Sequence, residues 1–264
     1  MLPPKPFRLL PLLLAVMTLA TGIGPVSAAD KTSKANDDFT AIFDGKTLDG
    51  WKGDPVYWRV QDGAIVGEIT PETIVKRNTF LIWQGGQPAD FELKLEYRIT
   101  KQGNSGVNYR SAIMDDHPFA LTGYQSDIDG RNRFTGQNYE ERGRTTLAYL
   151  GQVTVIPPLD RKLDTAGRKA LINRNAWTAT KLVKSLGTKE ELTKDLAPDQ
   201  WHEMHIVAKG NRLQHFVNGV LMSDVTDNDP QHRRMAGSIG VQVHVGPPMK
   251  VEYRKIRLKE LDEG

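Results

Sequence analysis

The segment Phe91–Ile99, FELKLEYRI, alternates apolar and charged residues without interruption over nine positions. Successive side chains of a β-strand point to opposite faces of its sheet, so this alternation predicts a strand with one dry face and one wet face. The dry face needs a second layer to cover it. The chain is therefore expected to fold around a sheet packed against another element.

Shorter apolar runs separated by turns continue along the chain. Hairpin turns are indicated by Asp62-Gly63, Gly210-Asn211 and Asn218-Gly219, whose residues tolerate positive φ. In the last run the apolar parity changes between Tyr253 and Ile256, which predicts a β-bulge near Arg254 and Lys255. The expected strands lie at 58–66, 91–99, 107–111, 124–128, 202–208, 213–217, 238–245 and 251–258.

Helical signal is confined to a capping box, in which Glu191 follows Thr188 by three residues, and it predicts one short helix near 188–197. Many strands, frequent turns and little helix predict an all-β fold of two packed antiparallel sheets, either a sandwich or a jelly roll.

The N-terminal residues have the pattern of an export signal. Lys5 and Arg8 precede an apolar run, and small residues around 26–28 offer a cleavage site. We therefore expect a signal peptide at 1–28, a flexible tether at 29–38 and a single domain at 39–263, exported to the periplasm or secreted, with no membrane span after cleavage. The absence of cysteine excludes disulfides and thiolate metal sites.

The charge pattern does not favour nucleic acid. The formal net charge is +3, of which two positive charges belong to the predicted signal peptide, and both signs are interspersed. The locally basic segment 161–194 also carries acids and lacks interleaved aromatics, so it predicts a solvated insertion. The number of chains in the assembly is not indicated.

Three of the expected strands carry rows of polar residues. Alternation in a strand sends every second side chain to the same face, so each row is expected to lie on one side. A solvated outer surface explains such rows equally well, but amide, carboxylate, imidazole and guanidinium groups are also those that bind sugars and transfer protons. The rows are Gln125, Asp127 and Asp129; Gln242 and His244; and Gly106, Asn108 and Arg110.

Long motifs identify a resemblance. The segments FDGKTLDGWKG, WRVQDGAIVGE, GNSGVNYR, GYQSDID, FTGQNYEERGR and GSIGVQVHVGPPMKVEYRKIRLKEL resemble, in this order, the 3-keto-disaccharide hydrolase domain family, over nearly all of 39–261. The resemblance implies a concanavalin-like jelly roll, usually exported, that acts on a carbohydrate substrate. Similar members cleave glycosides oxidised at C3 of the sugar, by net hydrolysis or by a lyase step.

That chemistry assigns expected roles. A C3 ketone acidifies the C2 hydrogen, and the glycosidic oxygen on C1 is β to the resulting enolate, so elimination needs a base, an oxyanion partner and an acid. We expect His244 as base or acid, Asp127 as base or as the group that orients His244, and Arg110 as oxyanion partner, its guanidinium reaching into the cleft beside them. The expected substrate-binding residues are Gln125, Glu68, Asn108, Tyr109, Glu140, Glu141 and Gln242, and any of the three glutamates among them could be the acid.

Several alternatives stay open. Arg110 could form a structural salt bridge with Asp127, and His202, His205 and His215 fit packing roles. No cofactor is required; a divalent metal on Asp127, Asp129 and His244 is possible chemically, but no spacing demands it. The chain could also be a noncatalytic carbohydrate-binding module that stacks Tyr109, Tyr124 or Trp83 on sugars. A two-carboxylate glycosidase is disfavoured because the E-x-D-x-x-E strand motif is absent.

Overall fold

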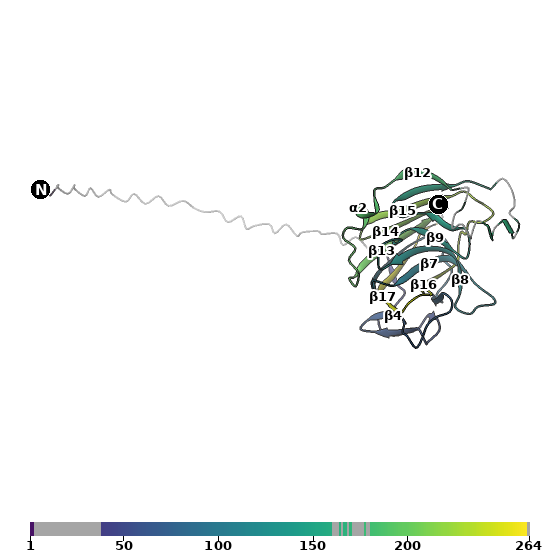
Figure 1. Ribbon diagram of the computed structural model, residues 1–264, viewed down its shortest axis with the longest axis horizontal. Helices are drawn as coiled ribbons and strands as arrows, with labels where there is room; N and C mark the ends of the chain where they lie inside the picture. Colours follow the sequence, from purple (N-terminus) through teal and green to yellow (C-terminus); the bar gives the residue numbers. More distant parts are fainter. Residues whose placement is uncertain are drawn as a thin grey trace, which may run out of the picture. The chain divides into compact units, whose positions relative to one another are not determined.

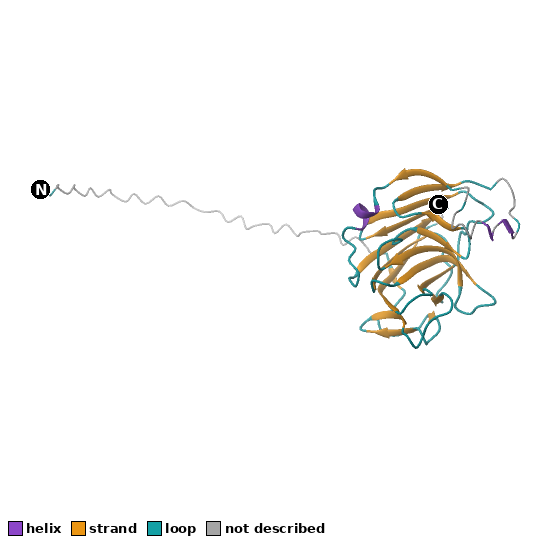
Figure 2. Cartoon of the chain, in the orientation of Figure 1, coloured by secondary structure: helices purple, strands orange, loops and turns teal. Residues whose placement is uncertain are grey.

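The computed structural model of the chain describes residues 38–159 and 180–262, together with 1–2, 164, 166–167, 169–170 and 177. The predicted signal peptide at 1–28 and almost all of the predicted tether at 29–38 lie outside the described residues, apart from the first two positions and Asp38. Within the described residues, no helix is long and apolar enough to cross a membrane. From Asp38 onward the chain forms one unit, in which two β-sheets pack face to face (Figures 1 and 2).

The larger sheet has ten strands among the described residues. The predicted strand Phe91–Ile99 is β6, near its middle, and its side chains alternate between buried and half-buried along the whole strand. The order across the sheet is β12 (Lys181–Ser185), β11 (Gln152–Ile156), β15 (Val220–Asp227), β14 (Arg212–Val217), β13 (His202–Lys209), β6 (Phe91–Ile99), β17 (Met249–Glu260), β4 (Ala64–Ile69) and β3 (Trp58–Gln61), with β1 (Thr40–Ala41) also paired to β17.

The smaller sheet has seven strands in the same part of the chain. All its pairs are antiparallel, whereas the larger sheet contains one parallel pair, β11 with β15. The predicted antiparallel two-sheet sandwich is thus confirmed. The order across the smaller sheet is β10 (Thr145–Ala148), β9 (Asn138–Glu141), β8 (Leu121–Asp129), β7 (Asn104–Ile113), β16 (Ser238–Val243), β5 (Thr79–Trp83) and β2 (Trp51–Lys52).

The inner faces of the two sheets meet in an aromatic-rich core. Tyr109 of β7 stacks on Tyr124 of β8, with ring centroids 5.6 Å apart, and meets the edge of Phe91 of β6 at 6.0 Å. Each of these rings is at most 1% exposed. Because apolar side chains of β7 and β8 fill this interface, the polar side chains that alternate with them must point to the outer face of the smaller sheet.

Turns and irregularities follow the sequence signals. Asp62 and Asn218 adopt positive φ in their hairpins. The predicted bulge in β17 is confirmed, because Lys255 has φ of 51° and the register with β6 shifts between Arg254 and Arg257. Because of the bulge, the apolar side chains before it, Val251 and Tyr253, and those after it, Ile256 and Leu258, can all be buried in the core. The predicted helix is α2 (Lys189–Thr193), and its Thr188–Glu191 capping box is present.

Much of the part of segment 161–194 that precedes residue 180, predicted to be a solvated insertion, lies outside the described residues, whereas the later part contributes a strand. Within it, β12 pairs with β11 at the edge of the larger sheet, and all its residues are exposed. Lysines at both ends of its apolar pair Leu182 and Val183 are typical of an edge strand that resists further pairing.

Candidate functional site

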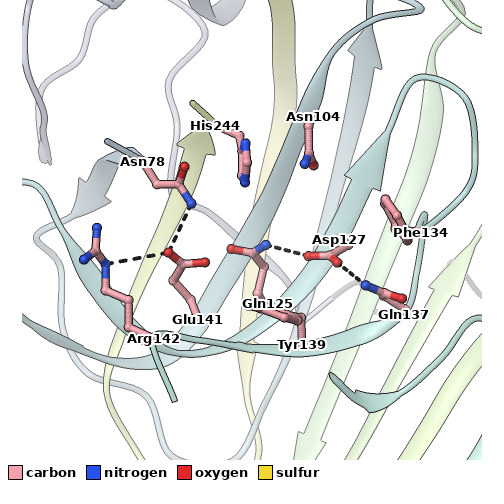
Figure 3. A pocket seen from close by; sticks show the side chains of 10 residues that line it. All are labelled: Asn78, Asn104, Gln125, Asp127, Phe134, Gln137, Tyr139, Glu141, Arg142 and His244. Atoms are coloured by element: carbon pink, nitrogen blue, oxygen red, sulfur yellow. Dashed lines mark hydrogen bonds and ion pairs between the residues drawn. The ribbon is translucent and has the colours of Figure 1, made fainter. Parts of the chain in front are cut away.

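A polar hollow of about 420 Å³ lies on the outer face of the smaller sheet (Figure 3). It forms where β8, β7 and β16 run side by side, which are the strands that carry the polar rows found in the sequence. Half of its lining side chains lie on strands β7, β8 and β9, so the strand register fixes their positions, and the other half come from the connecting segments. The residues that line it are Asn78, Asn104, Gln125, Asp127, Phe134, Gln137, Tyr139, Glu141, Arg142 and His244.

Asp127 is held by amide groups on both oxygens. Gln125 Nε2 donates to its Oδ1 at 2.5 Å, and Gln137 Nε2 donates to its Oδ2 at 2.6 Å. Gln125 Oε1 in turn accepts a hydrogen bond of 3.0 Å from Gln242 Nε2. This chain of amides fixes the plane of the carboxyl group and leaves its remaining lone pairs for a substrate.

Gly106 makes this arrangement possible. It lies opposite Asp127 in the register of β7 and β8, and the Gln125 side chain lies across it. A Cβ at this position would come within 2.5 Å of Gln125 Cδ. Only glycine therefore leaves room for the amide that holds Asp127.

The surroundings of Asp127 favour its protonated form. Burial raises its pKa from 3.8 to about 7, against the lowering effect of the two glutamine amides, and the nearby carboxylates of Glu141 and Asp129 raise it further. Only 7% of the residue is exposed. A carboxyl group with a pKa near neutral can both accept and return a proton under physiological conditions.

Glu141 supplies a second carboxyl group to the hollow. Its Oε1 accepts a hydrogen bond of 3.1 Å from Asn78 Nδ2, and Asn78 is itself fixed because its Oδ1 accepts from Val245 N at 2.9 Å. Arg142 Nε lies 3.7 Å from the same carboxyl oxygen. Burial raises the pKa of Glu141, although hydrogen bonding to Asn78 and the charges of Arg142 and His244 oppose the shift.

His244 follows the end of β16 at the rim of the hollow. Its Nδ1 lies 2.6 Å from the carbonyl oxygen of Val245. A carbonyl oxygen only accepts, so Nδ1 carries the proton and Nε2 is the ring nitrogen open to a ligand. Figure 3 shows His244 and Asn104 on one side of the hollow, with Glu141, Gln125 and Asp127 on the other.

Arg110 does not lie in this hollow, which corrects the expectation from strand parity. It has φ of 44°, and the register of β7 with β8 shifts between Tyr109 and Ala112, so a bulge breaks the alternation at this residue. Its guanidinium instead donates to the carbonyl oxygens of Ala89 and Gly210, at 2.8 and 2.7 Å, and to Asp90 Oδ1 at 2.9 Å. Arg110 is only 1% exposed and ties the smaller sheet to loops of the larger one.

Two predicted binding glutamates also lie elsewhere. Glu68, on β4 of the larger sheet, pairs with Arg59 at 2.6 Å. Glu140 points into the sandwich, where it pairs with Arg144 at 2.7 Å, and Arg144 also contacts Asp227 at 2.5 Å. Since Glu140 and Glu141 are neighbours on β9, the pleat of the strand sends one to the core and the other to the hollow.

Tyr109 and Asn108 are likewise inaccessible to a substrate. Tyr109 is fully buried between the sheets, where its hydroxyl lies 2.8 Å from His215 Nε2. Asn108 is fully buried and does not line the hollow. Gln242 is also fully buried, and it acts on the hollow through Gln125. The burial of Tyr109 and Tyr124 removes two of the three aromatics considered for sugar stacking.

Sequence reasoning missed several lining residues. Gln137 and Tyr139 belong to the motif FTGQNYEERGR, but only the glutamates of that motif were singled out. Asn78 precedes β5, a short apolar strand that the periodicity did not reveal. The missed residues that line the hollow are Asn78, Asn104, Phe134, Gln137, Tyr139 and Arg142.

The three histidines expected to pack lie outside the hollow. His215 is fully buried, His202 is 7% exposed, and His205 pairs with Glu92 at 2.8 Å. Across the part of the chain that the structure describes, no group of three or more histidine, aspartate or glutamate side chains is placed to hold a metal ion.

The fold and the hollow together define a jelly-roll protein with an acidic, amide-lined site on the outer face of its smaller sheet. The sequence model of the 3-keto-alpha-glucoside-1,2-lyase-like domain matches residues 38–259, so the chain belongs to that family. The predicted family resemblance is thereby confirmed. The family is named for a lyase that acts on 3-keto-alpha-glucosides.

Individual relatives are more distant. A 3-keto-disaccharide hydrolase of Bacteroides thetaiotaomicron is 36% identical over 80 residues, which span 28% of this chain and only 27% of that protein. A candidate glycosyl hydrolase from Parabacteroides distasonis, known as a crystal structure, is 17% identical, with a TM-score of 0.51 and coverage of 85% of this chain and 94% of that one.

A Bacillus subtilis protein of unknown function with a galectin-like fold is 12% identical, with a TM-score of 0.50 and coverage of 81% and 90% of the two chains. These two solved structures support the fold.

Proposed function

We propose that this protein cleaves the glycosidic bond of 3-keto-glycosides by removing the C2 proton and eliminating the group on C1, with water addition completing a net hydrolysis where it follows. The observation that carries the proposal is the presence of two buried carboxyl groups, Asp127 and Glu141, in one polar hollow, each with a raised pKa. Family membership supports the choice of 3-keto-glycosides as substrates.

Asp127 is the proposed base. Its carboxylate takes the proton from C2, and the electrons of the C2–H bond form a C2–C3 double bond while the carbonyl electrons move to O3. The two glutamine amides hold the carboxyl plane, so little reorganisation accompanies the transfer. A base with a pKa near the working pH is the most effective one, because it is both ionised and sufficiently basic.

Glu141 is the proposed acid. When the electrons on O3 return to the carbonyl, a C1–C2 double bond forms and the C1–O bond breaks, with its electron pair leaving on the glycosidic oxygen. The protonated Glu141 gives its proton to that oxygen, and the aglycone departs. The raised pKa of Glu141, caused by burial, keeps a larger fraction of it protonated than on a free surface.

His244 and Asn104 complete the site. In this proposal His244 Nε2, when protonated, and the Asn104 amide face the ketone oxygen from the side of the hollow opposite the carboxyl groups, and they receive its developing charge (Figure 3). This role replaces the one expected for Arg110, whose donors are occupied elsewhere. The open face of Phe134, which is 37% exposed, provides an apolar wall for the sugar ring.

The test uses the purified protein with a 3-keto-glucoside and its unoxidised parent, with and without a chelator. We expect release of the aglycone from the keto compound only, together with exchange of the C2 hydrogen in deuterated water. Asp127→Asn should lower kcat by about a hundredfold or more and abolish the exchange, since a general base contributes roughly 10²–10⁴ in rate.

The control is Glu190→Gln on α2, which also replaces one carboxylate by an amide. It should leave kcat unchanged. Equal cleavage of the parent sugar would refute the mechanism. Binding of the keto sugar without any release of aglycone would instead assign the chain to noncatalytic carbohydrate binding.

A further inference from the structure

A second hollow of about 300 Å³ adjoins the first. The side chains of Asn78 and Arg142 line both hollows. Neither of these residues binds the sugar ring in the proposed mechanism, and both contact Glu141, the proposed acid. The second hollow is lined by Asp54, Tyr57, Val75, Lys76, Arg77, Asn78, Thr79, His117, Pro118, Phe119, Ala120 and Arg142.

The lining of the second hollow is cationic. Three cationic side chains line it, those of Lys76, Arg77 and Arg142, and only one carboxyl group does so, that of Asp54. Arg142 is paired with Glu141, and Arg77 Nη1 donates to the ring of His117. Within the described residues, neither Lys76 nor Arg77 makes an ion pair, so two positive charges at this wall lack a counter-ion.

The remaining wall of the second hollow is apolar. It is lined by Val75, which is 5% exposed, and by the rings of Tyr57, Pro118 and Phe119. The first hollow offers mainly amides and carboxyl groups. The two hollows therefore suit different halves of one ligand: a polyhydroxyl ring in the first, and an apolar body that carries a negative charge in the second.

We propose that the second hollow holds the leaving group, and that the preferred substrates are 3-keto-glycosides whose aglycone has an aromatic or similarly apolar body with a carboxylate. This inference rests on the function proposed above. The scissile oxygen then lies at the shared wall, beside Glu141. The sugar ring is placed over Asp127, and the anionic end of the aglycone is placed toward Arg77 and Lys76.

The test compares two nearly isosteric substrates, 4-carboxyphenyl and 4-carbamoylphenyl 3-keto-glucoside, each prepared as both anomers. The quantity measured is the ratio of their kcat/KM values in the wild type and in the double variant Arg77→Gln, Lys76→Gln. Dividing one ratio by the other cancels the different leaving abilities of the two phenols. Arg59→Gln, which removes a half-exposed arginine from β3 of the larger sheet, is the matched control.

We expect the double variant to reduce the preference for the carboxylate at least about threefold, mainly through KM, since exposed charge pairs contribute modestly and act on ground-state binding. The same preference should weaken in the wild type as salt is added. An identical ratio in the wild type and the double variant, with both substrates cleaved, would overturn the inference and leave the proposed function intact.

If neither substrate is cleaved, the proposed function fails and the second hollow is tested by binding alone. Calorimetry with 4-hydroxybenzoate then compares the wild type with the double variant. Weaker binding by the variant supports an anion site in the second hollow. Equal binding, or none to either protein, overturns it.

Discussion

Replacing Asp127 by asparagine is expected to stabilise the fold at alkaline pH while lowering kcat by about a hundredfold or more. Burial raises the pKa of Asp127 from 3.8 to about 7, so the folded protein binds this proton more tightly than the unfolded chain does. The contribution of Asp127 to the free energy of unfolding is therefore fully present below about pH 4. It falls as the pH rises toward 7 and does not change further at higher pH. Asparagine carries no such charge.

The size of the effect follows from the pKa difference. A shift from 3.8 to about 7 corresponds to on the order of 4 kcal/mol once the group is ionised, at about 1.36 kcal/mol per pH unit. The residue keeps 7% of its surface open to the hollow, so water offsets part of this cost, and we expect a gain of about 2 kcal/mol at pH 8.5. Gln137 can turn its amide so that its oxygen accepts from the amide nitrogen of the substituted side chain, and one hydrogen bond is thereby kept.

The assay is urea unfolding of the wild type and Asp127→Asn at a series of pH values between 4 and 9. The difference in unfolding free energy should grow from near zero at the acid end and level off above pH 7. Asp49→Asn, at an exposed turn, controls for the loss of one negative charge. A difference that does not vary with pH, or a variant less stable than the wild type at pH 8.5, would refute the reasoning.

Three further substitutions test other parts of the structure. Gly106→Ala should lower kcat because its Cβ would displace Gln125, with a loss of about 1–3 kcal/mol in stability measured by urea unfolding. Arg110→Ala should cost about 3–5 kcal/mol because it removes the counter-ion of Asp90 and leaves buried carbonyl oxygens without this donor, yet kcat per folded molecule should stay unchanged; a large fall in kcat with normal stability would show that Arg110 acts in catalysis after all. Arg144→Met should lower the melting temperature, by a similar loss of about 3–5 kcal/mol, because Glu140 and Asp227 lose their buried counter-ion.

Individual strands could be predicted from the sequence where one face is exposed to solvent and the other is buried. β6 alternates cleanly because its outer face meets water, and the bulge in β17 was visible because both apolar parities are buried. β5 was missed since five largely buried residues, TFLIW, show no period of two. β9 and β10 were missed because they are short and rich in polar residues that packing buries anyway.

The site could be predicted only as far as strand parity holds. Gln125, Asp127 and His244 were found because alternation extends unbroken through β8 and up to the end of β16. Arg110 was misplaced because the bulge at positive φ occurs on a residue other than glycine, so nothing in the local sequence marks it. Side chains from outside these strands, such as Asn78, depend on tertiary packing that no local pattern encodes.

The electrostatics of the hollow also distinguish between two ways of breaking a glycosidic bond. A retaining glycosidase needs one carboxylate that stays ionised to attack C1 and one that stays protonated, so it places the two groups in contrasting environments. In this hollow, burial raises the pKa of both Asp127 and Glu141, and their negative charges oppose each other. A nucleophile must stay an anion while it attacks C1, and the raised pKa of each group works against that state. The proposed elimination needs Asp127 as an anion only while it takes the C2 proton, and it uses the proton that burial favours on Glu141.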